Sequence, residues 1–302
     1  MKIRVFGYLL LVVLGFAIMS CGKKNTGSNQ NNQIDSTQTQ ELFVWVENAR
    51  VRKTPDLNGE VITEIHGGEK IILTGEQSDT KIKVKLRGVD FEDVWVKVKL
   101  SDGNEGWIFK GMLTDDETRA KDMNDFSIAP GVGVGKVYVH KKQEDIERIY
   151  GKEFVIPGKI YGAEGAEFPG FYVFKNSPLE LQCVISETDS TIDVIKITQP
   201  GGNWITDDGI KIGTTLDELV KLNGQPITFS GFGWDYGGWI YQYGSGKLSA
   251  LEGKMGICLG EPDDLTGLEG FLGDHDCSTR DKRILGKGVK VAEITVYHPA
   301  EI

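Results

Sequence analysis

Short runs of β-branched and aromatic residues, separated by turn-forming residues, most constrain the fold of residues 42–114. Residues 43–46, 61–65 and 94–100 alternate in polarity with a period of two, which is typical of strands with one buried face. Clusters of Gly, Pro, Asn and Asp lie between the runs, and Asp102-Gly103 has the composition of a tight hairpin turn. This spacing of short strands predicts a small β-barrel.

The motifs around these strands resemble those of bacterial SH3 domains. The matching segments are Asn48-Ala49-Arg50-Val51-Arg52 followed by Pro55, Gly67-Gly68-Glu69-Lys70-Ile71, Trp95-Val96-Lys97-Val98 and Gly106-Trp107-Ile108. The resemblance implies an SH3-like barrel that binds cell wall or peptide. The stretch from Lys81 to Asp93 is longer than the loop such domains often have, so the chain departs from the family pattern next to any ligand groove.

Three tryptophans of this region allow two interpretations. Trp45, Trp95 and Trp107 can form an aromatic ligand groove, or they can fill the core of a barrel too small to be stable without large side chains. Trp95 and Trp107 fit the core better, whereas Trp45 is a candidate ligand-binding residue.

The second region, residues 127–302, contains an internal repeat. A glycine-flanked strand, a helix that begins with acidic residues and ends at glycine, and two later strands each occur twice. The paired segments are 131–135 and 209–213, 142–151 and 215–224, 179–185 and 254–259, and 193–200 and 292–299. The spacing predicts copies at 127–204 and 205–302, with an insertion near 260–288 in the second copy and a linker at 115–126.

The expected fold is therefore mainly β of the α+β class: an SH3-like barrel followed by a tandem duplicated helix-plus-antiparallel-sheet domain. The order of elements in the duplicated domain loosely resembles the small outer-membrane lipoprotein and β-lactamase-inhibitor-like folds. That resemblance implies a binding surface formed by helix-plus-sheet units.

Seven aromatic residues crowd into residues 229–243, with small residues between them. Rigid amphipathic rings with small spacers are typical of binding surfaces. The alternative is a hairpin whose alternate rings pack on a helix. The candidate ligand-binding residues in this segment are Trp234, Tyr236, Trp239, Tyr241 and Tyr243.

The cysteines also leave alternatives open. Cys258 and Cys277 bracket the insertion and can form a disulfide in an oxidising compartment, or Cys183 and Cys258 can be equivalent buried strand residues of the two copies. Asp276-Cys277-Ser278 matches the nucleophile motif of cell-wall cysteine peptidases, but Cys277 is followed by a polar stretch rather than a packed helix. We therefore expect no enzyme, and a peptidase using Cys277 is the alternative.

The N-terminus has the layout of a secretory signal peptide, with Lys2 and Arg4 before an apolar run over 5–19 that is short for a membrane span. Ile18-Met19-Ser20-Cys21 resembles a bacterial lipobox, which implies a lipid such as palmitate on Cys21. The polar residues 22–41 predict a disordered tether. The expected location is the cell envelope, on the periplasmic face of the outer membrane in a Gram-negative organism.

The charge distribution narrows the partners. Residues 115–302 hold 19 basic and 30 acidic side chains, an excess of 11 negative charges, which disfavours nucleic acid. The run 131–135 lacks the spacing of a dinucleotide motif, and the acidic residues of 260–288 lack that of a calcium loop, so we expect no cofactor and no metal.

The overall expectation is a non-catalytic, lipid-anchored binding or scaffold protein. Its partners are the membrane, through Cys21, and peptidoglycan or an envelope protein. A further alternative is an inhibitor or assembly factor that docks through the surface from Trp234 to Tyr243.

Overall fold

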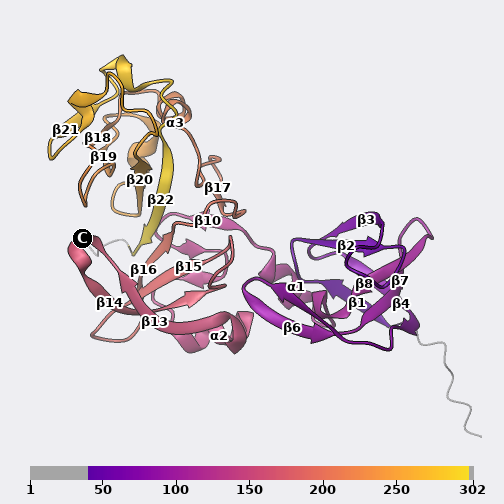
Figure 1. The fold of residues 1–302 in the computed structure, drawn as a ribbon. Helices are drawn as coiled ribbons and strands as arrows, with labels where there is room; N and C mark the ends of the chain where they lie inside the picture. The colour runs from indigo at the N-terminus through magenta and orange to yellow at the C-terminus, as the bar shows by residue number, and fades with distance from the viewer. Residues whose placement is uncertain (1–39, 299–302) are drawn as a thin grey trace, which may run out of the picture. The chain divides into compact units, whose positions relative to one another are not determined.

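The computed structural model describes residues 40–298 (Figure 1). The predicted signal peptide, Cys21 and nearly all of the predicted tether lie outside the described residues. No helix within 40–298 has the length and apolar character needed to cross a membrane. The described part is mostly β with three α-helices, which confirms the predicted fold class.

The first region is a seven-stranded sheet in the order β3-β2-β8-β7-β4-β1-β9, with antiparallel neighbours along its central strands. Its core consists of apolar residues from alternate strand positions, including Val44, Val98 and Ile108, all fully buried. The strands are β1 (Glu41–Val44), β2 (Asn48–Arg52), β3 (Val61–His66), β4 (Lys70–Gln77), β7 (Trp95–Lys99), β8 (Glu105–Phe109) and β9 (Leu113–Thr114).

The tryptophans of the barrel are mainly structural. Trp95 is buried in the core, as expected, and Trp107 is half-buried against it. Trp45 is only 5% exposed but lines a cavity of about 400 Å³ together with Leu42 and Phe91, so its ligand-binding role stays a prediction. Its indole N–H donates to the carbonyl of Gly111 at 2.8 Å, so the polar end of the ring is already satisfied within the fold.

The long stretch before Trp95 forms a separate hairpin of β5 (Ile82–Leu86) and β6 (Val89–Asp93). Its two turn residues, Arg87 and Gly88, have positive φ angles of 47° and 85°, as a tight type I′ turn requires. A Cβ atom on Gly88 would lie 1.9 Å from the carbonyl oxygen of Lys175. The tip of this hairpin therefore packs directly against the second region.

The side chain of Arg87 is buried at this contact. Its guanidinium lies 5.0 Å from the ring centre of Phe174, 5.6 Å from that of Trp45 and 5.9 Å from that of Phe126. Glu47 is 3.5 Å away and supplies the opposite charge. Burial lowers the pKa of Arg87, and Glu47 opposes that change. The insertion in the SH3-like barrel thus joins the two regions.

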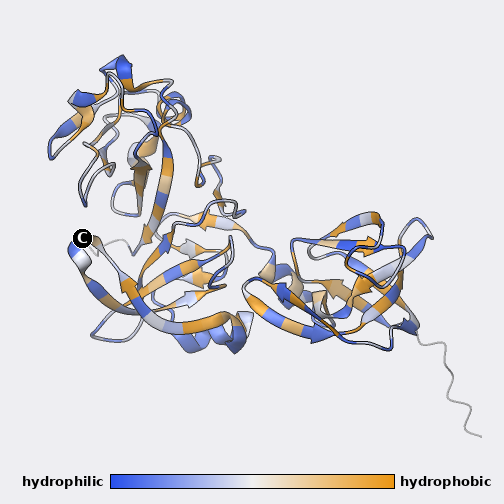
Figure 2. Ribbon diagram, in the orientation of Figure 1, coloured by the Kyte–Doolittle hydropathy of each residue, from blue (hydrophilic) through white to orange (hydrophobic). Residues whose placement is uncertain are grey.

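Three α-helices occur in the described residues: α1 (Glu117–Met123) in the predicted linker, α2 (Gln143–Tyr150) and α3 (Leu216–Asn223). The Thr215 hydroxyl accepts from the backbone N–H of Glu218, whose carboxylate accepts from the N–H of Thr215, which completes a capping box. Figure 2 shows that α2 is largely hydrophilic, while apolar residues concentrate on the strands. Short 3₁₀ turns span Lys110–Met112, Lys152–Phe154, Ala163–Gly165, Lys247–Leu251, Glu269–Phe271 and Lys282–Ile284.

The predicted copies share one six-stranded antiparallel sheet in the order β13-β14-β15-β16-β22-β20 (Figure 1). The first copy supplies four strands and the second copy supplies β22 and β20, so β16 and β22 join the copies. The strands are β13 (Val155–Tyr161), β14 (Glu167–Val173), β15 (Leu181–Ile185), β16 (Ile192–Ile197), β20 (Met255–Gly260) and β22 (Lys290–Tyr297).

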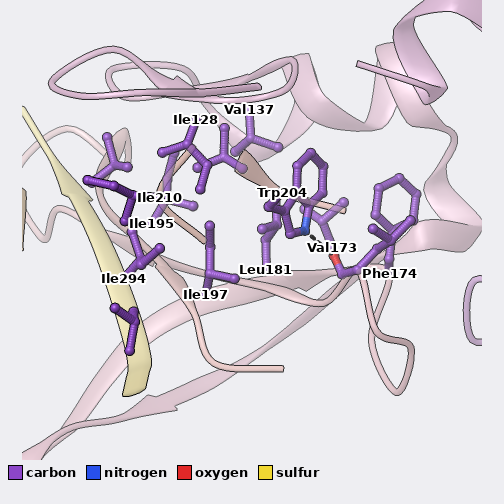
Figure 3. Packing of buried hydrophobic residues seen from close by; sticks show 14 of the residues in the cluster. Ile128, Val137, Val173, Phe174, Leu181, Ile195, Ile197, Trp204, Ile210 and Ile294 are labelled. Carbon is purple, nitrogen blue, oxygen red and sulfur yellow. Dashed lines mark hydrogen bonds between the residues drawn. The ribbon is translucent and has the colours of Figure 1, made fainter. Parts of the chain in front are cut away.

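Two smaller sheets complete this region. One has the order β12-β11-β10-β17, and the other has the order β19-β18-β21, where β21 comes from the predicted insertion. Their strands are β10 (Ser127–Ala129), β11 (Gly133–Val134), β12 (Val137–Tyr138), β17 (Ile205–Thr206), β18 (Thr228–Ser230), β19 (Ile240–Gln242) and β21 (Asp276–Ser278). Figure 3 shows one face of the large sheet, with Leu181, Ile195, Ile197 and Ile294, packed beneath Ile128 and Trp204.

The pairing register corrects one detail of the repeat. Cys183 pairs with Ile195 in the first copy, and Ile257 pairs with Ile294 in the second. Ile195 and Ile294 hold equivalent positions, so Ile257 rather than Cys258 corresponds to Cys183. A shift of one residue along a strand places a side chain on the opposite face of the sheet. Accordingly Cys183 is fully buried, whereas Cys258 is half-buried on the other face.

Candidate functional site

The outer face of the six-stranded sheet carries polar and aromatic side chains. Along β22, Ile294 and Val296 point into the core, so Glu293, Thr295 and Tyr297 share the opposite face. Lys196 on the neighbouring strand β16 pairs with Thr295 and lies on the same face. Lys196, Glu293 and Tyr297 form the floor of a cavity.

Two segments from different copies form its walls. The end of the β13–β14 hairpin contributes Tyr161, which is 60% exposed. The loop before β19 contributes Asp235, Tyr236 and Trp239. The backbone N–H of Glu164 donates to the Asp235 carboxylate at 2.9 Å, so the two walls are joined directly.

We call this cavity the aromatic cleft. Its volume is about 650 Å³, within the range of small-ligand sites. A smaller apolar pocket of about 220 Å³ adjoins it and adds Phe168, Val184 and Val194. The lining residues of the cleft are Tyr161, Gly162, Ala163, Glu164, Gly165, Lys196, Asp235, Tyr236, Trp239, Glu293 and Tyr297.

The charges in the cleft are predominantly negative. Glu164, Asp235 and Glu293 face one basic residue, Lys196, among the lining side chains. Lys196 and Glu293 form an ion pair at 3.3 Å, and their side chains are 17% and 21% exposed. Burial raises the pKa of Glu293 above its usual value, although Lys196 opposes that change. An anionic ligand would therefore be repelled.

A glycine in β20 permits the close packing of the cleft floor. A Cβ atom on Gly256 would lie 2.6 Å from the hydroxyl oxygens of Thr295 and Tyr297, and 2.8 Å from the ring of Trp239. Trp239 also makes a β-bridge to Cys258. The glycine thus lets the indole ring lie against the sheet.

The aromatic residues predicted from the sequence fall into two groups. Trp234, Tyr236 and Tyr241 are 36%, 43% and 45% exposed, and Trp239 is half-buried at the cleft. The prediction for Tyr243 is wrong, because it is 2% exposed and belongs to the core, as strand alternation requires of one face. Of the exposed residues, Tyr236 lines the cleft, whereas Trp234 and Tyr241 do not.

Lys196, Glu293 and Tyr297 were not among the site residues predicted from the sequence. These residues lie on β16 and β22, about a hundred positions apart in the chain, and only the pairing of those strands brings them together. Charged residues inside otherwise apolar strands, such as Lys196 in β16 and Glu293 in β22, could have indicated these positions.

All three described cysteines are free thiols, so the predicted disulfide between Cys258 and Cys277 does not form. Cys277 on β21 pairs with Phe229 on β18, β18 pairs with β19, and Cys258 bridges Trp239 just before β19. β18 and the segment that contains Trp239 therefore lie between the two cysteines. A disulfide requires the two Cα atoms to lie within about 7 Å of each other.

The surroundings of Cys277 are relevant to the peptidase alternative. The sulfur lies 3.7 Å from Nε2 of His275, but the residue is only 3% exposed. Burial, with a contribution from Asp276, raises the pKa of this thiol. A nucleophilic cysteine instead requires a lowered pKa.

One of the cavities lined by barrel residues, of about 380 Å³, lies beside β2, and we call it the barrel groove. Exposed Leu57 and the side chains of Arg50, Arg52 and Glu64 line it above Trp95. Arg50 forms an ion pair with Glu64 at 3.0 Å. No residue of the β5–β6 hairpin is among the described residues that line this groove.

Within residues 40–298, no three His, Cys, Asp or Glu side chains come together in a group able to hold a metal ion. Comparison with known families shows that residues 47–114 match the bacterial SH3 domain. No match was found among curated proteins. The matched range includes every residue that lines the barrel groove and the whole β5–β6 hairpin.

Proposed function

We propose that this protein is a non-catalytic binding protein of the bacterial cell envelope, anchored by lipid on Cys21, whose SH3 domain binds cell wall or peptide. The observation that carries the proposal is the bacterial SH3 match at 47–114, together with an open groove on that barrel. Bacterial SH3 domains commonly bind peptidoglycan.

The composition of the barrel groove suits peptide with free carboxylates. Arg50 and Arg52 supply guanidinium groups that bind carboxylates through two parallel hydrogen bonds. The Arg50–Glu64 pair is exposed, with side chains 60% and 45% accessible, so a ligand carboxylate can replace Glu64 at little cost. Leu57, 49% exposed, supplies an apolar contact.

Co-sedimentation of the detergent-solubilised full chain with purified peptidoglycan tests this proposal. Arg50→Glu and Leu57→Ser should each reduce the bound fraction, because they reverse a charge or remove an apolar contact in the barrel groove. Lys83→Glu is the matched control, since Lys83 is an exposed residue of the β5–β6 hairpin outside the groove. Equal losses of bound protein in all three variants, or no sedimentation of the unaltered protein, would contradict specific binding of peptidoglycan in the barrel groove.

The lipid anchor has its own test. Replacement of Cys21 by Ser should abolish incorporation of radiolabelled palmitate and move the protein from the membrane fraction to the soluble fraction. Two or three acyl chains supply most of the membrane affinity, and the acidic second region adds none on an anionic surface. Retention of Cys21→Ser in washed membranes would show that another contact localises the protein.

The burial and raised pKa of Cys277 support the non-catalytic part of the proposal. Digestion of peptidoglycan should be undetectable with the unaltered protein and with Cys277→Ala alike. Release of soluble wall fragments that disappears in Cys277→Ala would establish a cysteine peptidase instead.

A further inference from the structure

The aromatic cleft lies on the face of the six-stranded sheet and not at its edge. Its floor comes from β16 and β22, which are interior strands of the order β13-β14-β15-β16-β22-β20. Their backbone N–H and C=O groups are already paired with neighbouring strands. An extended peptide that binds by adding a strand needs a free sheet edge, so this cleft does not favour that mode of binding.

The side chains of the cleft offer flat apolar faces above a polar floor. Tyr161, Tyr236 and Trp239 come from both walls and line one cavity. Below them, Lys196 offers N–H donors and Glu293 offers acceptor oxygens, at the centre of a partly buried pair. A pyranose ring matches this arrangement, because its C–H faces stack on aromatic rings while its hydroxyl groups both donate and accept hydrogen bonds.

The charged side chains of the cleft limit the class of saccharide that can bind. Three carboxylates and one ammonium line the cleft, so sulfated, phosphorylated or uronic-acid saccharides are disfavoured. Neutral sugars, including those with acetamido groups, avoid this repulsion. The volume of about 650 Å³ suits more than one sugar ring, and the adjoining apolar pocket beside Phe168 can accept an acetamido methyl group.

From this geometry we infer that the aromatic cleft is a second binding site, separate from the barrel groove, that takes an uncharged oligosaccharide of N-acetylated amino sugars. The choice of amino sugars rests on the proposed function at the cell wall, whereas the saccharide class rests on the cleft. A chain with both sites would contact the peptide part of the wall through the barrel and the glycan part through the duplicated region.

Isothermal titration of the detergent-solubilised full chain with chitotetraose, the tetramer of N-acetylglucosamine, tests the inference. Tyr161→Ala and Tyr236→Ala should each weaken binding about tenfold, because each removes one stacking face that is exposed in the free protein. Tyr241→Ala is the matched control, since Tyr241 is 45% exposed in the same aromatic segment but does not line the cleft. It should change the affinity less than twofold.

Other outcomes would overturn the inference. Failure of chitotetraose to bind, or equal loss in Tyr161→Ala and Tyr241→Ala, would remove the cleft as a saccharide site. Tighter binding of an anionic oligosaccharide, such as a hyaluronan tetramer, would contradict the charge argument. The barrel variants Arg50→Glu and Leu57→Ser should bind chitotetraose normally, so failure of the barrel proposal and failure of this one are distinguishable.

Discussion

The buried Arg87 gives a stringent test of how the SH3 barrel and the duplicated region are held together. Its side chain is 3% exposed, contacts three aromatic rings at 5.0–5.9 Å and faces Glu47 at 3.5 Å. Nε and Nη1 have no hydrogen-bond partner among the described residues, whereas Nη2 donates to the carbonyl of Trp45 at 3.3 Å. Aromatic contacts and packing therefore contribute more than ionic pairing to its stabilising effect.

Replacement of Arg87 by Ala should lower the free energy of unfolding by about 3 kcal/mol. Cavity formation at a buried long side chain costs about 2–5 kcal/mol, and each desolvated cation–π contact contributes about 1–2 kcal/mol. Relief of the desolvation of the guanidinium offsets part of this loss. Glu47 keeps 25% of its side-chain surface accessible, so water can solvate its carboxylate in the variant. The loss of its partner therefore adds little to the destabilisation.

Arg87→Met separates packing from charge. Methionine retains a long unbranched stem among the rings without a buried charge, so its effect should stay within about 1 kcal/mol. Thermal unfolding followed by circular dichroism measures both variants, and the Ala variant should melt about 6–12 °C lower than the unaltered protein. Lys83→Ala, on the exposed side of the same hairpin, should melt within about 2 °C of it.

Two results would refute this reasoning. If Arg87→Met is as destabilising as Arg87→Ala, the ion pair with Glu47 rather than packing holds the contact. If Arg87→Ala melts within 2 °C of the unaltered protein, the tip of the β5–β6 hairpin is not packed against the second region in solution.

Three further predictions follow from local geometry. Gly256→Ala should weaken chitotetraose binding at least tenfold and shift the fluorescence emission of Trp239, because a Cβ atom at position 256 would lie 2.8 Å from the Trp239 ring. Unchanged affinity would show that the Trp239 ring has no part in the site. Thr215→Ala should cost about 1 kcal/mol in urea unfolding by removing one half of the capping box of α3, and no change in the midpoint would contradict that role. Burial raises the pKa of the Cys183 thiol above its usual value of 9.0, so the native state retains this proton more strongly than the unfolded state does, and stability should fall as pH rises above about 9. In Cys183→Val this fall should be shallower, and identical pH profiles would exclude Cys183 as a source of it.

Much of the local architecture follows from residue patterns. Period-two alternation in 43–46 and 94–100 leads to strands because one face of each must be buried. Thr215 and Glu218 at a spacing of three, with Gly224 after the last apolar residue, determine where α3 begins and ends. The SH3 motifs likewise identify the barrel without reference to its three-dimensional structure.

The repeat illustrates the limit of such patterns. Alignment on Cys183 and Cys258 is reasonable from the sequence, yet strand pairing places Ile257 at the equivalent position. A difference of one residue is invisible in composition but reverses the face on which a side chain lies. The burial of Trp45 and Tyr243 could not be predicted for a similar reason, since aromatic residues occur both in cores and on binding surfaces.

The sequence by itself determined the SH3 barrel, the limits of several strands and helices, and the aromatic enrichment of residues 229–243, because those depend on local periodicity and motif spacing. Tertiary structure alone decided that β16 pairs with β22, that Arg87 joins the barrel to the second region, and that Lys196 meets Glu293 in the cavity that Trp239 lines. Such contacts join residues far apart in the chain, and their free energy depends on burial and pairing that no single segment contains.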